Sequence, residues 1–196
     1  LDYSEVYRYL GYRKGVPEGE VRHVVEQCVE DLVSQAELKS VARRFPLKFL
    51  GDNRFLIGDM ELESRALSRN MRGCDEAYLM AATIGFAMDR LAARAAAIGR
   101  MSRAVIYQAA GAMLIESYCD ALNRKLKEEA AAEGKFLRPR FSPGYARDST
   151  GAVPRAGNSE AHRHYADREP FDDADQVGHG TDRRLARGFA LCPAGL

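Results

Sequence analysis

The sequence Arg-Pro-Arg-Phe-Ser-Pro-Gly-Tyr at residues 138–145 divides this 196-residue chain into two parts of different character. Before it, apolar residues recur with the periods of helices and strands, so we expect residues 1–145 to fold around a core. After it, residues 146–196 contain no Ile, no Met and no Lys, and no apolar period is sustained. Such a composition buries too little apolar surface to offset the entropy of ordering the chain. We therefore predict a folded domain over residues 1–145 and a mostly disordered tail over residues 146–196.

The first strong pattern is an amphipathic helix over residues 21–36, where apolar side chains fall on one face at helical spacing. We expect Pro46 to end this helix, because proline lacks the backbone N–H that a helix interior needs. Two short apolar runs, at residues 47–50 and 54–57, flank the turn-prone triplet Gly-Asp-Asn at residues 51–53. This arrangement predicts a β-hairpin.

The next segments alternate between helix and strand. Residues 61–72 have a helical composition, and Gly73 is suited to the left-handed conformation found at helix ends. Residues 77–84 form a compact apolar run that is short enough for a buried strand, although its periodicity alone is also compatible with a helix. We predict a helix and then a strand.

Two further helices are predicted, at residues 86–98 and 102–133. Ser102 is expected to cap the start of the second helix, and Gly134 to mark its end. Within that helix, residues 109–112 are Ala-Ala-Gly-Ala, a surface of small side chains that another backbone could approach closely.

Composition narrows the range of partners. The chain is 46% hydrophobic and 29% charged, and its 29 basic and 28 acidic side chains leave a formal net charge of +1. This balance creates no field that would attract nucleic acid or an anionic membrane surface, so we expect neither partner. No stretch has the apolar length that crosses a bilayer, and charged residues stand where a secretory signal would be apolar, so we expect a cytoplasmic protein. Leu1 in place of Met fits either a clipped fragment or a non-standard start codon.

Cysteine and histidine positions give no metal signal. Cys28, Cys74, Cys119 and Cys192 are far apart and lack paired spacing, so we expect buried thiols and no zinc site or redox pair. The histidines of the tail also match no standard ligand spacing, and a metal site is not predicted there.

Five short motifs together resemble a known family. They lie at residues 51–52, 58–64, 73–77, 81–85 and 140–145. With them the chain resembles small stand-alone relatives of the activation domain of cobalamin-dependent methionine synthase. The resemblance covers roughly residues 1–145, and its most specific element is the Arg-x-x-Pro-Gly-Tyr loop at residues 140–145.

The resemblance implies a role in rescuing an inactive corrinoid. Members of that family bind S-adenosylmethionine, and a flavodoxin-like donor supplies one electron to the inactive cob(II)alamin. Methyl transfer from S-adenosylmethionine then traps the reduced form. This chain contains no Asp-x-His-x-x-Gly cobalamin loop, so the cobalamin would be carried by a partner, a corrinoid-binding methionine synthase encoded separately.

The resemblance also implies ligand contacts. Arg140 would bind the carboxylate of S-adenosylmethionine, because the guanidinium group offers a planar fork that matches a carboxylate. Pro143, Gly144 and Tyr145 would shape the loop against the ligand. Glu116, on the long predicted helix, would meet the positive end of the ligand.

The resemblance also predicts an α+β fold in which long helices pack on a small mixed or antiparallel sheet. Family members continue beyond this loop into further strands, which residues 146–196 do not resemble. Residues 146–184 can be back-translated with ordinary codons so that a reading shifted by one nucleotide contains LTESxxMxPxxSV, which resembles the family's own C-terminal motif. We therefore expect the C-terminal strands to be lost through a frameshift near the codon of Tyr145.

The sequence leaves the catalytic status of the chain open. One alternative to a reactivation module is a non-catalytic module that interacts with a corrinoid protein. A second alternative is an inactive, truncated product of a broken frame.

Overall fold

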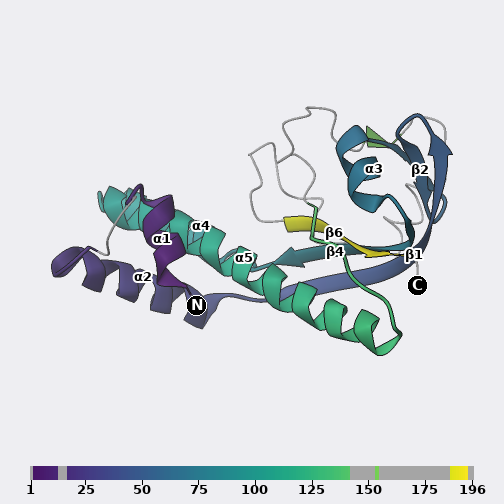
Figure 1. Ribbon diagram of the computed structural model, residues 1–196. Coiled ribbons are helices and arrows are strands. Elements are labelled where there is room, and N and C mark those ends of the chain that lie inside the picture. Colours follow the sequence, from purple (N-terminus) through teal and green to yellow (C-terminus); the bar gives the residue numbers. More distant parts are fainter. Residues whose placement is uncertain (1, 13–16, 142–152, 155–185, 194–196) are drawn as a thin grey trace. The chain divides into compact units, whose positions relative to one another are not determined.

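The computed structural model describes residues 2–12, 17–141, 153–154 and 186–193, the last two stretches in backbone only (Figure 1). The chain divides into two compact units. The first consists mainly of Leu1–Val41 and Ala82–Leu122, and the second mainly of Ala42–Ala81 and the chain after Leu122. Helices dominate the first unit, and strands dominate the second.

The first unit begins with two helices, α1 (Tyr3–Tyr9) and α2 (Glu20–Gln35). The sequence pattern did not indicate α1, which begins where the Asp2 side chain accepts a hydrogen bond from the backbone N–H of Ser4 at 2.9 Å. Helix α2 confirms the amphipathic helix predicted at residues 21–36. Its buried residues are Val25, Cys28, Val29 and Leu32.

The predicted end of α2 is wrong. The helix stops at Gln35, because Ala36 is already extended, and strand β1 (Lys39–Gly51) runs through Pro46. The carbonyl group of Pro46 accepts a hydrogen bond from the N–H of Gly58 at 2.9 Å, so proline takes part in the sheet as an acceptor. A proline fits a strand wherever its missing N–H is not required by a neighbouring strand.

The two remaining predicted helices are confirmed as α4 (Ala87–Ala97) and α5 (Met101–Ala132). The predicted cap is wrong, because α5 already includes Met101, and the carbonyl group of Arg100 accepts from the N–H of Ala104 at 3.2 Å. The small-residue surface of α5 meets a side chain: a Cβ atom added at Gly111 would lie 2.6 Å from Cγ of Met88 on α4. The absence of a side chain at Gly111 therefore allows close packing of these two helices.

The strands form one sheet in the order β5-β3-β2-β1-β4-β6. Strand β2 (Arg54–Ile57) pairs with β1 and β3 (Met60–Glu63), and β3 pairs with β5 (Val153–Pro154), all antiparallel. The predicted hairpin is confirmed, with Asp52 and Asn53 at φ angles of 50° and 64°. Positive φ at both central residues is the geometry that matches the twist of paired strands.

The helix predicted at residues 61–72 is partly wrong. Its first residues belong to β3, and the helix α3 (Arg65–Met71) begins after Ser64, whose side chain accepts from the N–H of Leu67 at 3.3 Å. The charged composition of Met60–Glu63 suits a helix, but pairing with β2 satisfies its backbone in a strand. The strand predicted at residues 77–84 is confirmed as β4 (Cys74–Thr83), which begins three residues earlier.

Two segments of the tail contribute strands to the sheet, β5 and β6 (Ala186–Pro193). The loss of the family's own C-terminal strands stays a prediction. A sheet edge offers unpaired N–H and C=O groups to any extended segment, whatever its composition. The disorder and the frameshift predicted for the rest of residues 146–196 lie outside the described residues.

The second unit has an apolar core between the sheet and α3. The buried members are Leu47, Phe55, Ile57, Leu62, Leu67, Met71, Cys74 and Ala77. Phe141, which follows Arg140, packs against this core. Helix α3 contributes Leu67 and Met71, which are both fully buried.

Candidate functional site

The described part of each unit contains one of the residues predicted to bind a ligand. Glu116 lies on α5 within the first unit, and Arg140 lies in the second unit. Pro143, Gly144 and Tyr145 lie outside the described residues. The structure therefore shows the local surroundings of Glu116 and of Arg140, each within its own unit.

Glu116 lines an open hollow of about 400 Å³ formed by α1 and α5. Helix α5 contributes four of the lining residues at positions 113, 116, 117 and 120. Side chains spaced by three, four and seven residues lie on one face of a helix, which is why these four converge. The described lining residues are Asp2, Glu5, Arg8, Tyr9, Met113, Glu116, Ser117 and Asp120.

The lining of this hollow carries an excess of negative charge. Its described residues include four carboxylates and a single cation, Arg8, which is paired with Glu5 and lies 4.7 Å from the centre of the Tyr9 ring. The hydrogen bond from Ser4 lowers the pKa of Asp2, so this carboxylate stays ionised at neutral pH. Such a surface favours a ligand that presents a positive group.

The apolar part of the hollow comes from Met113 and Tyr9. Met113 is 2% exposed and accepts a hydrogen bond on its sulfur from Oγ of Ser117 at 3.6 Å. Met113 is therefore a core residue that also lines the hollow. The contribution of Asp2, Glu5 and Tyr9 was missed, because no pattern in the sequence indicated α1.

Arg140 lies in an irregular segment, residues 133–141, which follows the end of α5. Gly134 adopts a φ of 72°, and the N–H of Lys135 bonds back to the carbonyl group of Ala130 at 2.9 Å, which ends the helix as predicted. Arg140 itself is half-buried. A half-buried arginine can pack part of its side chain against the protein and still contact a ligand.

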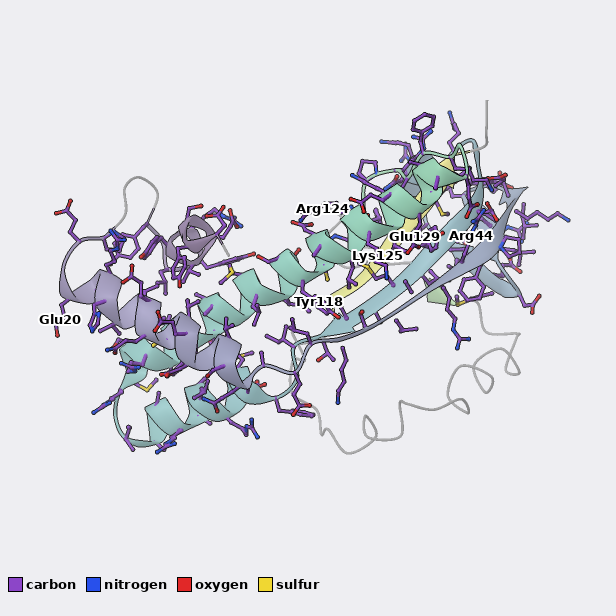
Figure 2. All side chains as sticks on the ribbon, turned by 90° about the horizontal axis from the view of Figure 1, so that it is seen from below. Glu20, Arg44, Tyr118, Arg124, Lys125 and Glu129 are labelled. Carbon is purple, nitrogen blue, oxygen red and sulfur yellow. The ribbon has the colours of Figure 1, made fainter. Side chains whose placement is uncertain are left out.

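Four charged side chains hold the beginning of this segment to the sheet. We call this set, Arg44, Glu76, Glu133 and Lys135, the β4 ion cluster. Nε of Arg44 donates to Glu76 at 2.8 Å, and its Nη1 donates to Glu133 at 2.6 Å. Lys135 also pairs with Glu76. In Figure 2, Arg44 is seen on β1 close to the C-terminal part of α5, consistent with its ion pair to Glu133.

The ion cluster perturbs its own members. Hydrogen bonds from Arg44 and then from Lys135 lower the pKa of Glu76, so its carboxylate is ionised well into the acid range. The same contact with Glu76 raises the pKa of Lys135. Both shifts favour the charged forms, so Glu76 and Lys135 are ionised at neutral pH.

A second hollow, of about 340 Å³, lies between the hairpin and the end of α3. Its lining residues are Phe49, Gly51, Asp52, Asn53, Arg54, Ser68, Arg72 and Gly73. The turn at residues 51–53 and Gly73 were identified from the sequence, but their proximity depends on the packing of α3 against the sheet.

The described cysteines are structural. Cys28, Cys74 and Cys119 are buried thiols, as predicted, and burial raises the pKa of the Cys28 and Cys74 thiols. A raised pKa lowers the reactive thiolate fraction. Over the described ranges, no group of three or more His, Cys, Asp or Glu side chains could hold a metal ion. The tail histidines lie outside these ranges, as does the side chain of Cys192.

No helix in the described part of the chain combines the length and the apolar character needed to cross a membrane.

Comparison with known proteins finds similarity among solved structures. No family model and no curated protein matches this sequence. Among solved structures, the crystal structure of the MetH reactivation domain bound to AdoHcy is similar, with a TM-score of 0.59 and 14% sequence identity. The match covers 97% of this chain and 73% of that one. At this identity the likeness establishes the fold, which confirms the predicted α+β, activation-domain-like architecture.

Proposed function

We propose that this chain is a module that binds S-adenosylmethionine for the reductive reactivation of a corrinoid carried by a separate methionine synthase. The observation that carries the proposal is the similarity of the fold to a reactivation domain bound to AdoHcy. AdoHcy is what remains of S-adenosylmethionine once its methyl group has been transferred. A fold of this kind would therefore hold both the methyl donor and its product.

The surroundings of Glu116 support a role in recognising the positive groups of the ligand. S-adenosylmethionine carries a sulfonium centre and an ammonium group, and the hollow around Glu116 is lined by carboxylates, Tyr9 and Met113. Carboxylates and an aromatic ring both attract a cation, and the thioether of Met113 gives the hollow an apolar wall.

The surroundings of Arg140 support recognition of the carboxylate end. Arg140 follows a segment that is tied to the sheet, and its side chain is half-buried. A guanidinium group can bind a carboxylate through two parallel hydrogen bonds. The residues of this chain would bind and orient the methyl donor, while the partner protein supplies the cobalt chemistry and a flavodoxin-like protein supplies the electron.

Binding is the first test of this proposal. We expect calorimetry to detect S-adenosylmethionine and AdoHcy binding to the full chain. Arg140→Ala should weaken binding at least tenfold, because a charge-assisted hydrogen bond contributes about 1.5–3 kcal/mol. Arg124→Ala, an exposed arginine of the same unit on α5, is the matched control and should bind normally. Absence of binding to the unaltered chain would refute the proposal.

Glu116 needs its own variant. Glu116→Gln removes the charge with little change in shape and should weaken S-adenosylmethionine more than AdoHcy, since only the former carries a sulfonium charge. Glu128→Gln, at an exposed position on the same helix, is the control. Equal losses for both ligands would argue against a contact between Glu116 and the sulfonium group.

Activity separates this function from a purely binding role. With a corrinoid partner, an electron donor and S-adenosylmethionine, we expect the chain to stimulate formation of methylcobalamin. Binding without stimulation would favour the alternative of a non-catalytic module.

A further inference from the structure

We propose that Glu76 is a positioning residue for Arg140, because the β4 ion cluster fixes the segment that carries this arginine. The inference rests on the proposed function, which gives Arg140 its role in ligand binding. Glu76 lies on β4, 64 positions before Arg140 in the sequence, and acts through its contacts with Arg44 and Lys135.

Glu76 is the centre of the cluster. Both nitrogens at one edge of the Arg44 guanidinium group donate to its carboxylate, Nε at 2.8 Å and Nη2 to the other oxygen. Lys135 binds the same carboxylate. About a quarter of each side chain is exposed, 26% for Arg44, 25% for Glu76 and 22% for Lys135. Ion pairs at this depth are screened less by salt than pairs on the open surface.

The cluster contacts the chain on both sides of the turn that ends α5. Glu133 precedes Gly134 and binds Arg44 on β1, whereas Lys135 follows Gly134 and binds Glu76 on β4. Strands β1 and β4 are neighbours in the sheet. The direction in which the chain leaves the helix is therefore set by two contacts with two adjacent strands.

Two further contacts hold the chain on either side of Arg140. Nη2 of Arg138 donates to the backbone carbonyl group of Arg72 at 2.9 Å, just before β4. Phe141 packs against the apolar core of the second unit. Residues 133, 135, 138 and 141 are thus anchored in turn, and Arg140 lies between the last two.

These side-chain contacts fix the segment in place of the backbone hydrogen bonds of a helix or strand. Residues 135–140 belong to no helix or strand, so no ladder of backbone hydrogen bonds fixes their conformation. A binding residue on such a segment loses affinity if the segment must be ordered when the ligand arrives. Ordering it beforehand through side-chain contacts removes that cost from the binding step.

Hydrogen exchange of the full chain without ligand tests the positioning directly. In Glu76→Gln, we expect protection of the amides in residues 133–141 to fall about tenfold, since a local contact that limits opening has been weakened. Glu61→Gln is the matched control: Glu61 is 31% exposed in the same unit, and its partner is Arg54 on β2. This control should leave exchange in the segment unchanged.

Ligand affinity provides the second readout. Glu76→Gln should weaken S-adenosylmethionine about tenfold, yet leave the affinity for decarboxylated S-adenosylmethionine unchanged, because that analogue has no carboxylate for Arg140 to bind. General damage to the fold would weaken both ligands together. The Glu61→Gln control should change neither affinity.

Lys135→Gln tests the same inference in case Glu76→Gln does not fold. It removes the contact on the segment side while Arg44 still neutralises Glu76, and it should reproduce the faster exchange and the selective loss of affinity. Unchanged protection of residues 133–141 in both Glu76→Gln and Lys135→Gln would overturn the inference, even if the unaltered chain binds S-adenosylmethionine. Failure of the unaltered chain to bind would overturn the ligand role of Arg140 and the proposed function, whereas the exchange result would still report whether the cluster holds the segment.

Discussion

The two units hold their candidate binding residues by different physical means. In the first unit, Glu116 lies on a long helix, where backbone hydrogen bonds and packing fix its position. In the second, Arg140 lies on an irregular segment that depends on the β4 ion cluster, Arg138 and Phe141. The candidate site of the sheet unit should therefore be sensitive to charge and pH, and the helical unit to changes in packing.

The largest effect is expected in the core of the sheet unit. Phe55 is fully buried, and Phe55→Ala should lower the free energy of unfolding by about 3–5 kcal/mol because a large cavity is left behind. Since Phe141 packs on the same core, binding that depends on Arg140 should weaken too. Chemical denaturation and calorimetry measure the two effects.

Phe49→Ala provides the control on the same hairpin. Phe49 is 39% exposed, and its ring centre lies 6.2 Å from that of Phe55. Phe49→Ala should therefore lower the free energy of unfolding by only about 1 kcal/mol. Similar losses for both variants would show that the core assigned to this unit is wrong.

A smaller and pH-dependent loss of stability is expected when the charge of Glu76 is removed. Glu76→Gln should cost about 1–2 kcal/mol of unfolding free energy at pH 7, where the carboxylate accepts charged hydrogen bonds. The folded-state pKa of Glu76 is lowered from 4.5, so its stabilisation is complete above that value and is lost as the pH falls through the lower, folded pKa. The difference between the variant and the unaltered chain should therefore shrink below about pH 4.5.

Denaturation from pH 7 to pH 3 measures this dependence. The same titration of Glu61→Gln should show a smaller difference at pH 7, because the closest contact of its pair with Arg54 is 3.3 Å. If the difference in unfolding free energy between Glu76→Gln and the unaltered chain increased as the pH fell, the assigned direction of the pKa shift would be wrong.

In the helical unit, a change in packing should produce an effect of about 1 kcal/mol. Gly111→Ala places a methyl group 2.6 Å from Cγ of Met88, and overpacking of 1–3 kcal/mol outweighs the gain of about 1 kcal/mol in helix propensity. Thermal or chemical denaturation should show a net loss of stability.

Adding Met88→Ala to Gly111→Ala checks the cause. The cost of Gly111→Ala should disappear when Met88 is shortened, since the clash is with that side chain. If Gly111→Ala alone stabilises the chain, Met88 is free to move and the two helices are not closely fitted at this point.

The smallest effect is expected for an exposed polar contact of the helical unit. The hydroxyl group of Tyr118, labelled on α5 in Figure 2, donates to Oγ of Ser40 at 2.9 Å. Tyr118→Phe should change the unfolding free energy by less than about 0.5 kcal/mol, because water can replace this bond.

Tyr107→Phe is the buried counterpart. Tyr107 is 4% exposed, and its hydroxyl group donates to Asp31 at 3.0 Å, so the variant should cost about 1 kcal/mol. If Tyr118→Phe lowered the free energy of unfolding more than Tyr107→Phe, the prediction that polar surface contacts contribute little to the stability of this unit would be wrong.

Local sequence determined the elements whose signals are local. The spacing of Val25, Cys28, Val29 and Leu32 predicted the buried face of α2. Gly51-Asp52-Asn53 predicted the hairpin, because these residue types tolerate the positive φ angles that its turn requires. Gly134 predicted the end of α5 for the same reason. The sequence resemblance also indicated the fold that the structural comparison establishes.

Tertiary structure decided the features that depend on distant partners. Met60–Glu63 is a strand because it pairs with β2, and Pro46 lies within a strand because its carbonyl group meets Gly58. The β4 ion cluster joins residues up to 89 positions apart, and no local pattern could have identified it. Periodicity and turn preferences are properties of neighbouring residues, whereas pairing and charge contacts exist only once the chain has folded.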